Sequence, residues 1–152
     1  MKRFMFVVTI SMIIFPFFSV SLFAQRGGMN KRNAGWGAGS QYNRMYNVNT
    51  VETITGEVIS VDKITPAKGM SYGIHLLVKT YKETISVHLG PSWFMDNQKI
   101  KISPKDNVTV TGSRITYKSI PAIIASEITK GDVTLTLRDK NGYPVWSGSR
   151  RK

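Results

Sequence analysis

Residues 74–89 read IHLLVKTYKETISVHL, and this stretch decides the fold class. Apolar residues occupy every second position on both sides of a short polar segment: Ile74, Leu76 and Val78 before it, and Ile85, Val87 and Leu89 after it. A period of two places alternate side chains on one face of a β-strand. The stretch therefore predicts two antiparallel strands that face the same core.

The register of this hairpin predicts that the two histidines of the chain are neighbours. If Tyr81 and Lys82 form a two-residue loop, counting outward places His75 opposite His88. Opposed residues have Cβ atoms roughly 4.5–5.5 Å apart, so both rings could contact one metal ion, and imidazole suits Cu, Ni and Zn. The alternative is an ordinary cross-strand pair on the polar face, because zinc sites usually take three or four protein ligands and the chain has no cysteine.

The elements on either side of the hairpin also have strand periodicity. Residues 51–64 are predicted to form a first strand, in which Gly56 and a change of apolar phase indicate a bulge and strong curvature. The Gly-Pro that follows Leu89 ends the third strand, and a short helix is predicted over 93–98. Further strands are expected at 108–112 and 122–128, and an Asn-Gly turn predicts a final hairpin over 133–146.

The order of these elements predicts an all-β fold with one small helix. It corresponds to an OB-fold-like five-stranded Greek-key barrel with a short helix between strands 3 and 4, to which a C-terminal hairpin is added. The expected barrel domain is residues 50–148, followed by a basic tail at 149–152.

The N-terminus has the pattern of a signal peptide. Two basic residues precede a long uncharged apolar run that ends at Ala24, so residues 1–24 are predicted to direct export. The run is also long enough to remain as an uncleaved membrane anchor, although Pro16 and two serines disfavour this. Both alternatives place the rest of the chain in the periplasm or outside the cell.

Most of the net charge of +12 lies in the terminal segments. Residues 25–49 are rich in Gly, Asn, Arg and aromatics without apolar periodicity, so a flexible basic leader is expected there. Between Val51 and Ser149, twelve basic residues accompany nine acidic ones. The barrel itself therefore carries only a small excess of positive charge, and the leader is the part suited to weak contact with an anionic envelope surface.

Three stretches resemble a group of exported bacterial OB-fold proteins of uncharacterised function that are often labelled DNA-binding. These stretches are TVETITGEV at 50–58, HLGPSWF at 88–94 and LRDKNGYPVW at 137–146. The layout is also distantly similar to the periplasmic bacterial OB-fold stress-tolerance family. The resemblance implies a non-enzymatic binding module in the envelope, and it supplies no established ligand.

Candidate ligand-binding residues are aromatic or basic side chains near the predicted hairpin and the fourth strand. They are Tyr72, Lys79, Tyr81, Lys82, Arg114 and Tyr117. Basic grooves with stacking aromatics bind single-stranded nucleic acid in many OB-folds, which makes nucleic-acid binding an alternative function. The interspersed acids and the predicted export disfavour it.

No catalytic motif is apparent in the sequence. It contains no cysteine nucleophile, no Gly-x-Ser-x-Gly elbow and no phosphate-binding glycine loop. The sequence therefore predicts a non-enzymatic periplasmic binding module for a small ligand, a metal ion or a protein partner, with an accessory role in envelope stress or metal handling as the expected setting. A third hypothesis is an envelope-surface factor that acts through its cationic leader.

Overall fold

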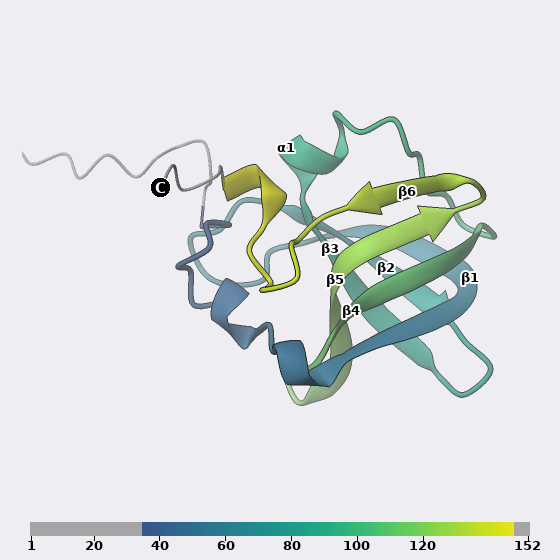
Figure 1. Cartoon of the computed structure of the whole chain (residues 1–152), viewed down its shortest axis with the longest axis horizontal. Coiled ribbons are helices and arrows are strands. Elements are labelled where there is room, and N and C mark those ends of the chain that lie inside the picture. The colour runs from purple at the N-terminus through teal and green to yellow at the C-terminus, as the bar shows by residue number, and fades with distance from the viewer. Residues whose placement is uncertain (1–34, 148–152) are drawn as a thin grey trace, which may run out of the picture.

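The computed structural model describes residues 35–147, which form a barrel with terminal segments packed on its outside (Figure 1). The predicted signal peptide at 1–24 and the basic tail at 149–152 lie outside the described residues. The elements in chain order are η1 (Asn43–Met45), η2 (Val48–Thr50), β1 (Val51–Ile64), β2 (Gly73–Lys79), β3 (Thr84–Pro91), α1 (Ser92–Met95), β4 (Asn107–Tyr117), β5 (Ile120–Lys130), β6 (Val133–Thr136) and η3 (Val145–Ser147).

Five strands close into the barrel that the sequence predicted. The sheet order is β3-β2-β1-β4-β5-β6, and a parallel pairing between β3 and β5 closes the ring. The long β1 pairs with β4 through its first half and with β2 through its second half. A register shift between Val58 and Ser60 marks the predicted bulge, which bends β1 from one partner to the other.

The interior of the barrel is filled by the apolar residues that alternate along the strands. Leu76, Val78, Ile85 and Val87 are all buried in the main core cluster, as their period of two requires. The short helix α1 follows β3 directly, and Phe94 packs against the same core. The OB-fold-like architecture is therefore confirmed, including the helix between the third and fourth strands.

The predicted C-terminal hairpin forms only in part: one short strand, β6, is added to the sheet, and the returning segment ends in the 3-10 turn η3 instead of a second strand. β6 pairs with β5 over Val133–Thr136, and the chain then turns at Asn141 and Gly142, where Gly142 has φ +85°. The carboxylate of Asp139 accepts hydrogen bonds from the amides of Asn141 and Tyr143, and the returning arm makes a single bridge between Arg138 and Pro144.

The prediction of a flexible leader is wrong for the part of it that the structure describes. Residues 35–46, here called the strap, cross the outside of the barrel and bury Trp36 to 2% exposure and Tyr42 to 3%. With Ile124 of β5 these two side chains form a second apolar cluster, which Trp146 from the C-terminal segment also contacts. The composition suggested disorder, but two aromatic anchors bury enough surface to hold the segment in place.

The two terminal segments support each other on this side of the barrel (Figure 1). The indole Nε1 of Trp146 donates to the carbonyl of Trp36 at 2.9 Å, and the Asn43 side chain donates to the carbonyl of Gly142 at 3.4 Å. Both segments lie on the outer surface of the seam where β3 meets β5. They therefore cover the line along which the barrel closes.

Candidate functional site

The outer surface of β1, β2 and β3 carries three rows of side chains in direct cross-strand register. We call this surface the binding face, and its rows are Asp62, His75 and His88; Ser60, Leu77 and Ser86; and Glu57, Lys79 and Thr84. The residues between them point into the core, so those in the rows must point outward. Strands 2 and 3 carry the ligand surface of OB-folds, which makes this face the first candidate.

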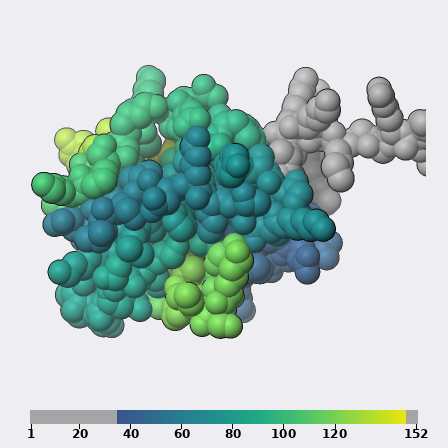
Figure 2. Space-filling model, turned by 180° about the vertical axis from the view of Figure 1, so that it is seen from behind, coloured from purple at the N-terminus to yellow at the C-terminus, as the bar shows by residue number. Residues whose placement is uncertain are grey.

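The binding face has a half-buried apolar centre within a mixed set of charges. Leu77 is half-buried and belongs to neither core cluster, while Glu57, Asp62 and Lys79 are exposed. Within residues 35–147, Lys79 forms no ion pair, and His75 contacts Asp62 at 3.8 Å. Figure 2 shows this side of the molecule, where the blue atoms of β1 and the teal atoms of β2 and β3 form one continuous surface.

The predicted pairing of the histidines is confirmed. His75 and His88 are cross-strand partners, and their ring centroids lie 5.9 Å apart. The expectation that the pair lies on an open polar face holds for only one of the two, because His88 is 1% exposed. The strap covers it, and the Tyr42 hydroxyl is hydrogen-bonded to its Nδ1 at 2.9 Å.

The available imidazole nitrogens of the pair face different neighbours. His75 Nε2 faces Asp62, while its Nδ1 lies 3.4 Å from Ser86 Oγ. His88 uses Nδ1 for Tyr42, and its buried Nε2 has no hydrogen-bond partner within residues 35–147. Throughout this range, no group of three or more His, Asp or Glu side chains is arranged to hold a metal ion. Binding of Cu, Ni or Zn by the pair thus stays a hypothesis with two ligands.

The environment of His88 favours its neutral form. Burial, together with the nearby His75 and Arg138, lowers the pKa of His88 to about 4. Tyr42 stacks on the ring at an interplanar angle of 17°, and Tyr117 packs edge-on with a centroid distance of 4.8 Å. Burial also raises the pKa of Tyr42 above its usual range. His88 therefore acts as a neutral hydrogen-bonding partner for the strap.

A buried cation lies beside this cluster. Arg138 is 2% exposed, and its Nη1 donates to the carbonyls of Ala125 and Leu89. Its guanidinium lies 5.0 Å from the Trp146 ring centre, and no described carboxylate pairs with it. Burial lowers the pKa of Arg138 to about 10, so it remains charged at neutral pH. Its contacts tie the C-terminal segment to β3 and β5.

The six predicted ligand-binding residues do not form one site. Tyr72 and Tyr81 are 61% and 90% exposed, but they flank opposite ends of β2, whose seven residues span roughly 23 Å at about 3.3 Å each. Lys79 and Lys82 are exposed near the tip that carries Tyr81, and the Lys82 ammonium lies 5.4 Å from the Tyr81 ring centre. The two tyrosines therefore cannot act as a single stacking platform.

Arg114 and Tyr117 have structural partners. The Arg114 guanidinium bonds to both Glu52 and Glu83, which lie 62 and 31 positions away in sequence. These two carboxylates raise the pKa of Arg114, and the pKa of Glu83 is lowered in return. The hydroxyl of Tyr117 donates to the carbonyl of Pro66 at 2.8 Å. Both residues hold loops and strands together, so neither is free in the way the sequence suggested.

The structure also brings together three residue types that sequence reasoning did not connect. Asp62 and His75 are cross-strand partners on β1 and β2, and Ser86 lies diagonally from His75 on β3. Ser86 Oγ is 3.4 Å from His75 Nδ1, and His75 Nε2 is 3.8 Å from the Asp62 carboxylate. A nucleophilic triad also needs donors for the developing oxyanion, and the strand amides around Ser86 lie within two paired ladders. The arrangement is suited to polar contacts with a partner.

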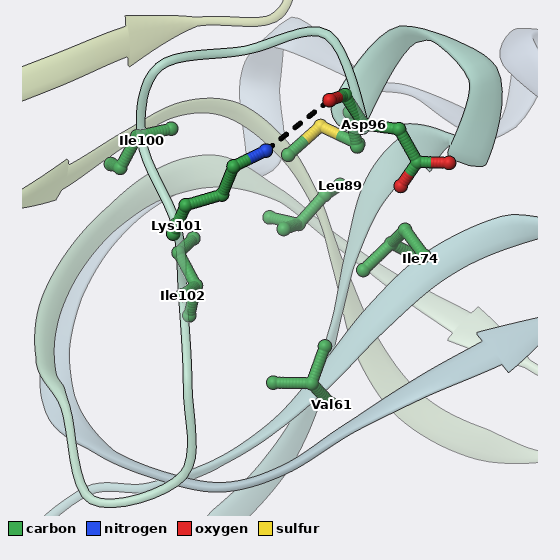
Figure 3. Close-up of a pocket in the computed structure, with 8 residues that line it drawn as sticks. Val61, Ile74, Leu89, Asp96, Ile100, Lys101 and Ile102 are labelled. Carbon is green, nitrogen blue, oxygen red and sulfur yellow. Dashed lines mark hydrogen bonds between the residues drawn. The ribbon is translucent and has the colours of Figure 1, made fainter.

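A partly open hollow lies at the α1 end of the barrel (Figure 3). Val61, Ile74, Leu89 and Ile102 point into it, and Lys101 donates to the carbonyl of Asp96 at its rim. Its volume is about 130 Å³. Sites for drug-sized ligands usually hold about 300–1,000 Å³, so this hollow is too small for such a molecule.

No helix in residues 35–147 is long and apolar enough to cross a membrane. No curated protein matches the chain. A profile of the MamS/MamX magnetosome protein family matches residues 50–135, which begin just before β1 and end within β6. This family is not one that the sequence resemblance named. Because the match covers more than half of the 152 residues, the chain belongs to the MamS/MamX magnetosome protein family.

Proposed function

We propose that this chain is an exported, non-enzymatic binding module that docks a protein partner on the binding face. The signal-like pattern of residues 1–24 supports export to the periplasm or beyond. The family match supports an accessory role at the magnetosome, since that is the setting named in the family's description. Catalysis is not part of the proposal, because the described polar clusters lack an oxyanion site.

One observation carries the choice of a protein partner. The binding face surrounds the half-buried Leu77 with charges of both signs, Glu57 and Asp62 on β1 and Lys79 on β2. Protein interfaces combine an apolar centre with a polar rim of mixed charge. A metal ion would require more converging ligands than the face offers, and a small molecule would require a deeper pocket.

Single-stranded nucleic acid is the second candidate. Exposed lysines that form no ion pair in the described residues favour it, namely Lys63, Lys68, Lys79, Lys82 and Lys118. Two observations place it behind a protein partner: Tyr72 and Tyr81 are too far apart to stack adjacent bases, and acids stand on the same face. Polyanion binding would weaken steeply with salt, whereas docking on Leu77 would not.

A single charge placed at Leu77 is expected to weaken partner binding at least tenfold. In envelope extracts of the source organism, the wild-type protein should migrate as part of a larger complex, and Leu77→Glu should migrate at the size of the free chain. A carboxylate buried in an apolar interface centre typically weakens binding by at least tenfold, about 1.4 kcal/mol. Size-exclusion chromatography with immunodetection measures this.

Val133→Glu provides the matched control. Val133 is an aliphatic residue on β6, 50% exposed and outside the binding face. It should leave the complex intact, and circular dichroism should show that both variants keep their strand content. Loss of the complex in both variants, or in neither, would remove the binding face from the proposal.

A further inference from the structure

The second half of β1 has an open edge. β4 pairs with β1 only as far as Glu57, whereas β2 follows it on the other side to Ile64. The last backbone bonds on the β4 side are those of Val58 with the loop before β4, and the described part of the chain makes no further backbone bond there. Every second residue of 60–64 therefore turns its N–H and C=O groups toward a free edge.

The hollow at the α1 end of the barrel adjoins this edge. Val61, in the open part of β1, forms one wall, and Ile102 lies across the hollow from it on the segment before β4 (Figure 3). The hollow has a volume of about 130 Å³. Apolar cavities of about 150 Å³ in other proteins bind a benzene molecule. The hollow therefore has the size of one aliphatic or aromatic side chain.

We propose that the open edge and the hollow together form a groove for an extended segment of a partner protein, which pairs with β1 and inserts one apolar side chain. A strand that pairs with β1 places every second side chain on the face that Val61 occupies. The residue opposite Val61 then points into the hollow. Strand addition takes its affinity from main-chain hydrogen bonds and its specificity from pockets for alternate side chains. Because Val61 points to the core side of β1, this groove is separate from the binding face and does not depend on docking at Leu77.

The charges around the groove favour a segment with acidic residues. Exposed lysines surround it, one on β1 and three on the segment between α1 and β4: Lys63, Lys99, Lys101 and Lys105. The same segment has two acids, of which Asp106 is paired with Lys130 at 2.8 Å and Asp96 is exposed. An apolar residue with acidic neighbours on either side therefore complements the groove. The lysines also disfavour a second copy at this edge, because two identical edges would repel each other.

Titration of the purified full chain with the synthetic peptide EETTLTTEE tests the groove. The peptide has acidic ends, β-branched residues that suit an extended backbone, and one central leucine. In NMR spectra it should shift the methyl signals of Val61 and Ile102 and protect amides within 60–64 from hydrogen exchange. The peptide EETTATTEE should bind roughly tenfold or more weakly, because it lacks the anchor. Absence of binding by EETTLTTEE, or equal binding of the two peptides, would overturn the proposal.

N-methylated peptides separate strand pairing from burial of the leucine alone. Alternate amides of a paired strand point to β1, and the amides between them point to solvent. Methylation of one alternate set in EETTLTTEE should abolish binding to the unaltered protein, and methylation of the other set should preserve it. Equal effects of the two sets would show that the peptide does not pair with β1.

Filling the hollow from the protein side should also prevent binding. Val61→Phe places a ring where the leucine of the peptide would lie. Val51→Phe is the matched control, because Val51 lies on the same strand but is 41% exposed and pairs with β4. The control should bind EETTLTTEE as the wild type does, and circular dichroism should show that both variants keep their strand content. Undiminished binding by a folded Val61→Phe variant would place the peptide elsewhere and contradict the groove.

Discussion

Replacing Trp36 by alanine is expected to lower the free energy of unfolding by about 3–5 kcal/mol, because large-to-small changes at buried Trp residues cost that much. Trp36 is 2% exposed, packs edge-on against Tyr42 at 5.2 Å and against Trp146 at 6.3 Å, and donates its indole hydrogen bond to Ser71. Urea unfolding monitored by circular dichroism measures the loss.

Tyr81→Ala is the matched control for this prediction. Tyr81 is also aromatic but is 90% exposed, and surface substitutions usually stay within about 0.5 kcal/mol of the parent. A flexible leader would make the Trp36 change equally neutral. Equal midpoints for the two variants would therefore show that the strap does not contribute to the fold.

Acidification from pH 7 to pH 5 is expected to cost about 2 kcal/mol of stability through His88 alone, at 1.36 kcal/mol per pKa unit. The pKa of His88 is lowered from 6.5 to about 4, chiefly by burial. The unfolded state therefore binds the proton first as the pH falls. The stabilising effect is fully present above pH 6.5 and is lost progressively down to about pH 4.

The effect of His88 can be separated from that of the carboxylates. Glu83 and Asp106 have lowered pKa values because of Arg114 and Lys130 respectively, so their contribution is lost only as the pH falls below their ordinary range near 4. Urea midpoints between pH 7 and pH 5 thus report mainly on histidine. His88→Gln should flatten the profile over this interval. A wild-type profile that is already flat would contradict the buried, neutral state of His88.

The barrel could be predicted from the sequence because its signals are local. Alternation at Ile74, Leu76 and Val78 defines a strand by itself, and counting from a two-residue turn was enough to pair His75 with His88. The phase change near Gly56 correctly placed the bend of β1. These inferences require only neighbouring residues and fixed geometry.

The strap and the ion pairs could not be predicted because they depend on distant partners. Trp36 is held by Ser71 and by Trp146, which is 110 positions away, and nothing in its glycine-rich surroundings indicates burial. The one available signal was an aromatic pair at Trp36 and Tyr42 in an otherwise polar segment. Arg114 is a basic residue of the kind that often binds ligands. Only the tertiary structure shows that its guanidinium already pairs with two carboxylates.

The strap also affects which ligands the fold can take. Its anchors contact the loop between β1 and β2 through Ser71, and they cover His88 on β3, so part of the surface that OB-folds offer to extended ligands is occupied by the chain itself. What remains open is the binding face around Leu77. Both segments that cover the seam lie largely outside the residues that match the family profile.

Site-specific photo-cross-linking at the binding face tests the functional proposal most directly. A diazirine amino acid is incorporated at position 77, or at position 133 as the control, and cells of the source organism are irradiated. The proposal predicts a discrete protein adduct from position 77 that is absent from position 133 and unaffected by nuclease. A nuclease-sensitive adduct, or the same adducts from both positions, would contradict a protein-docking face on β1–β3.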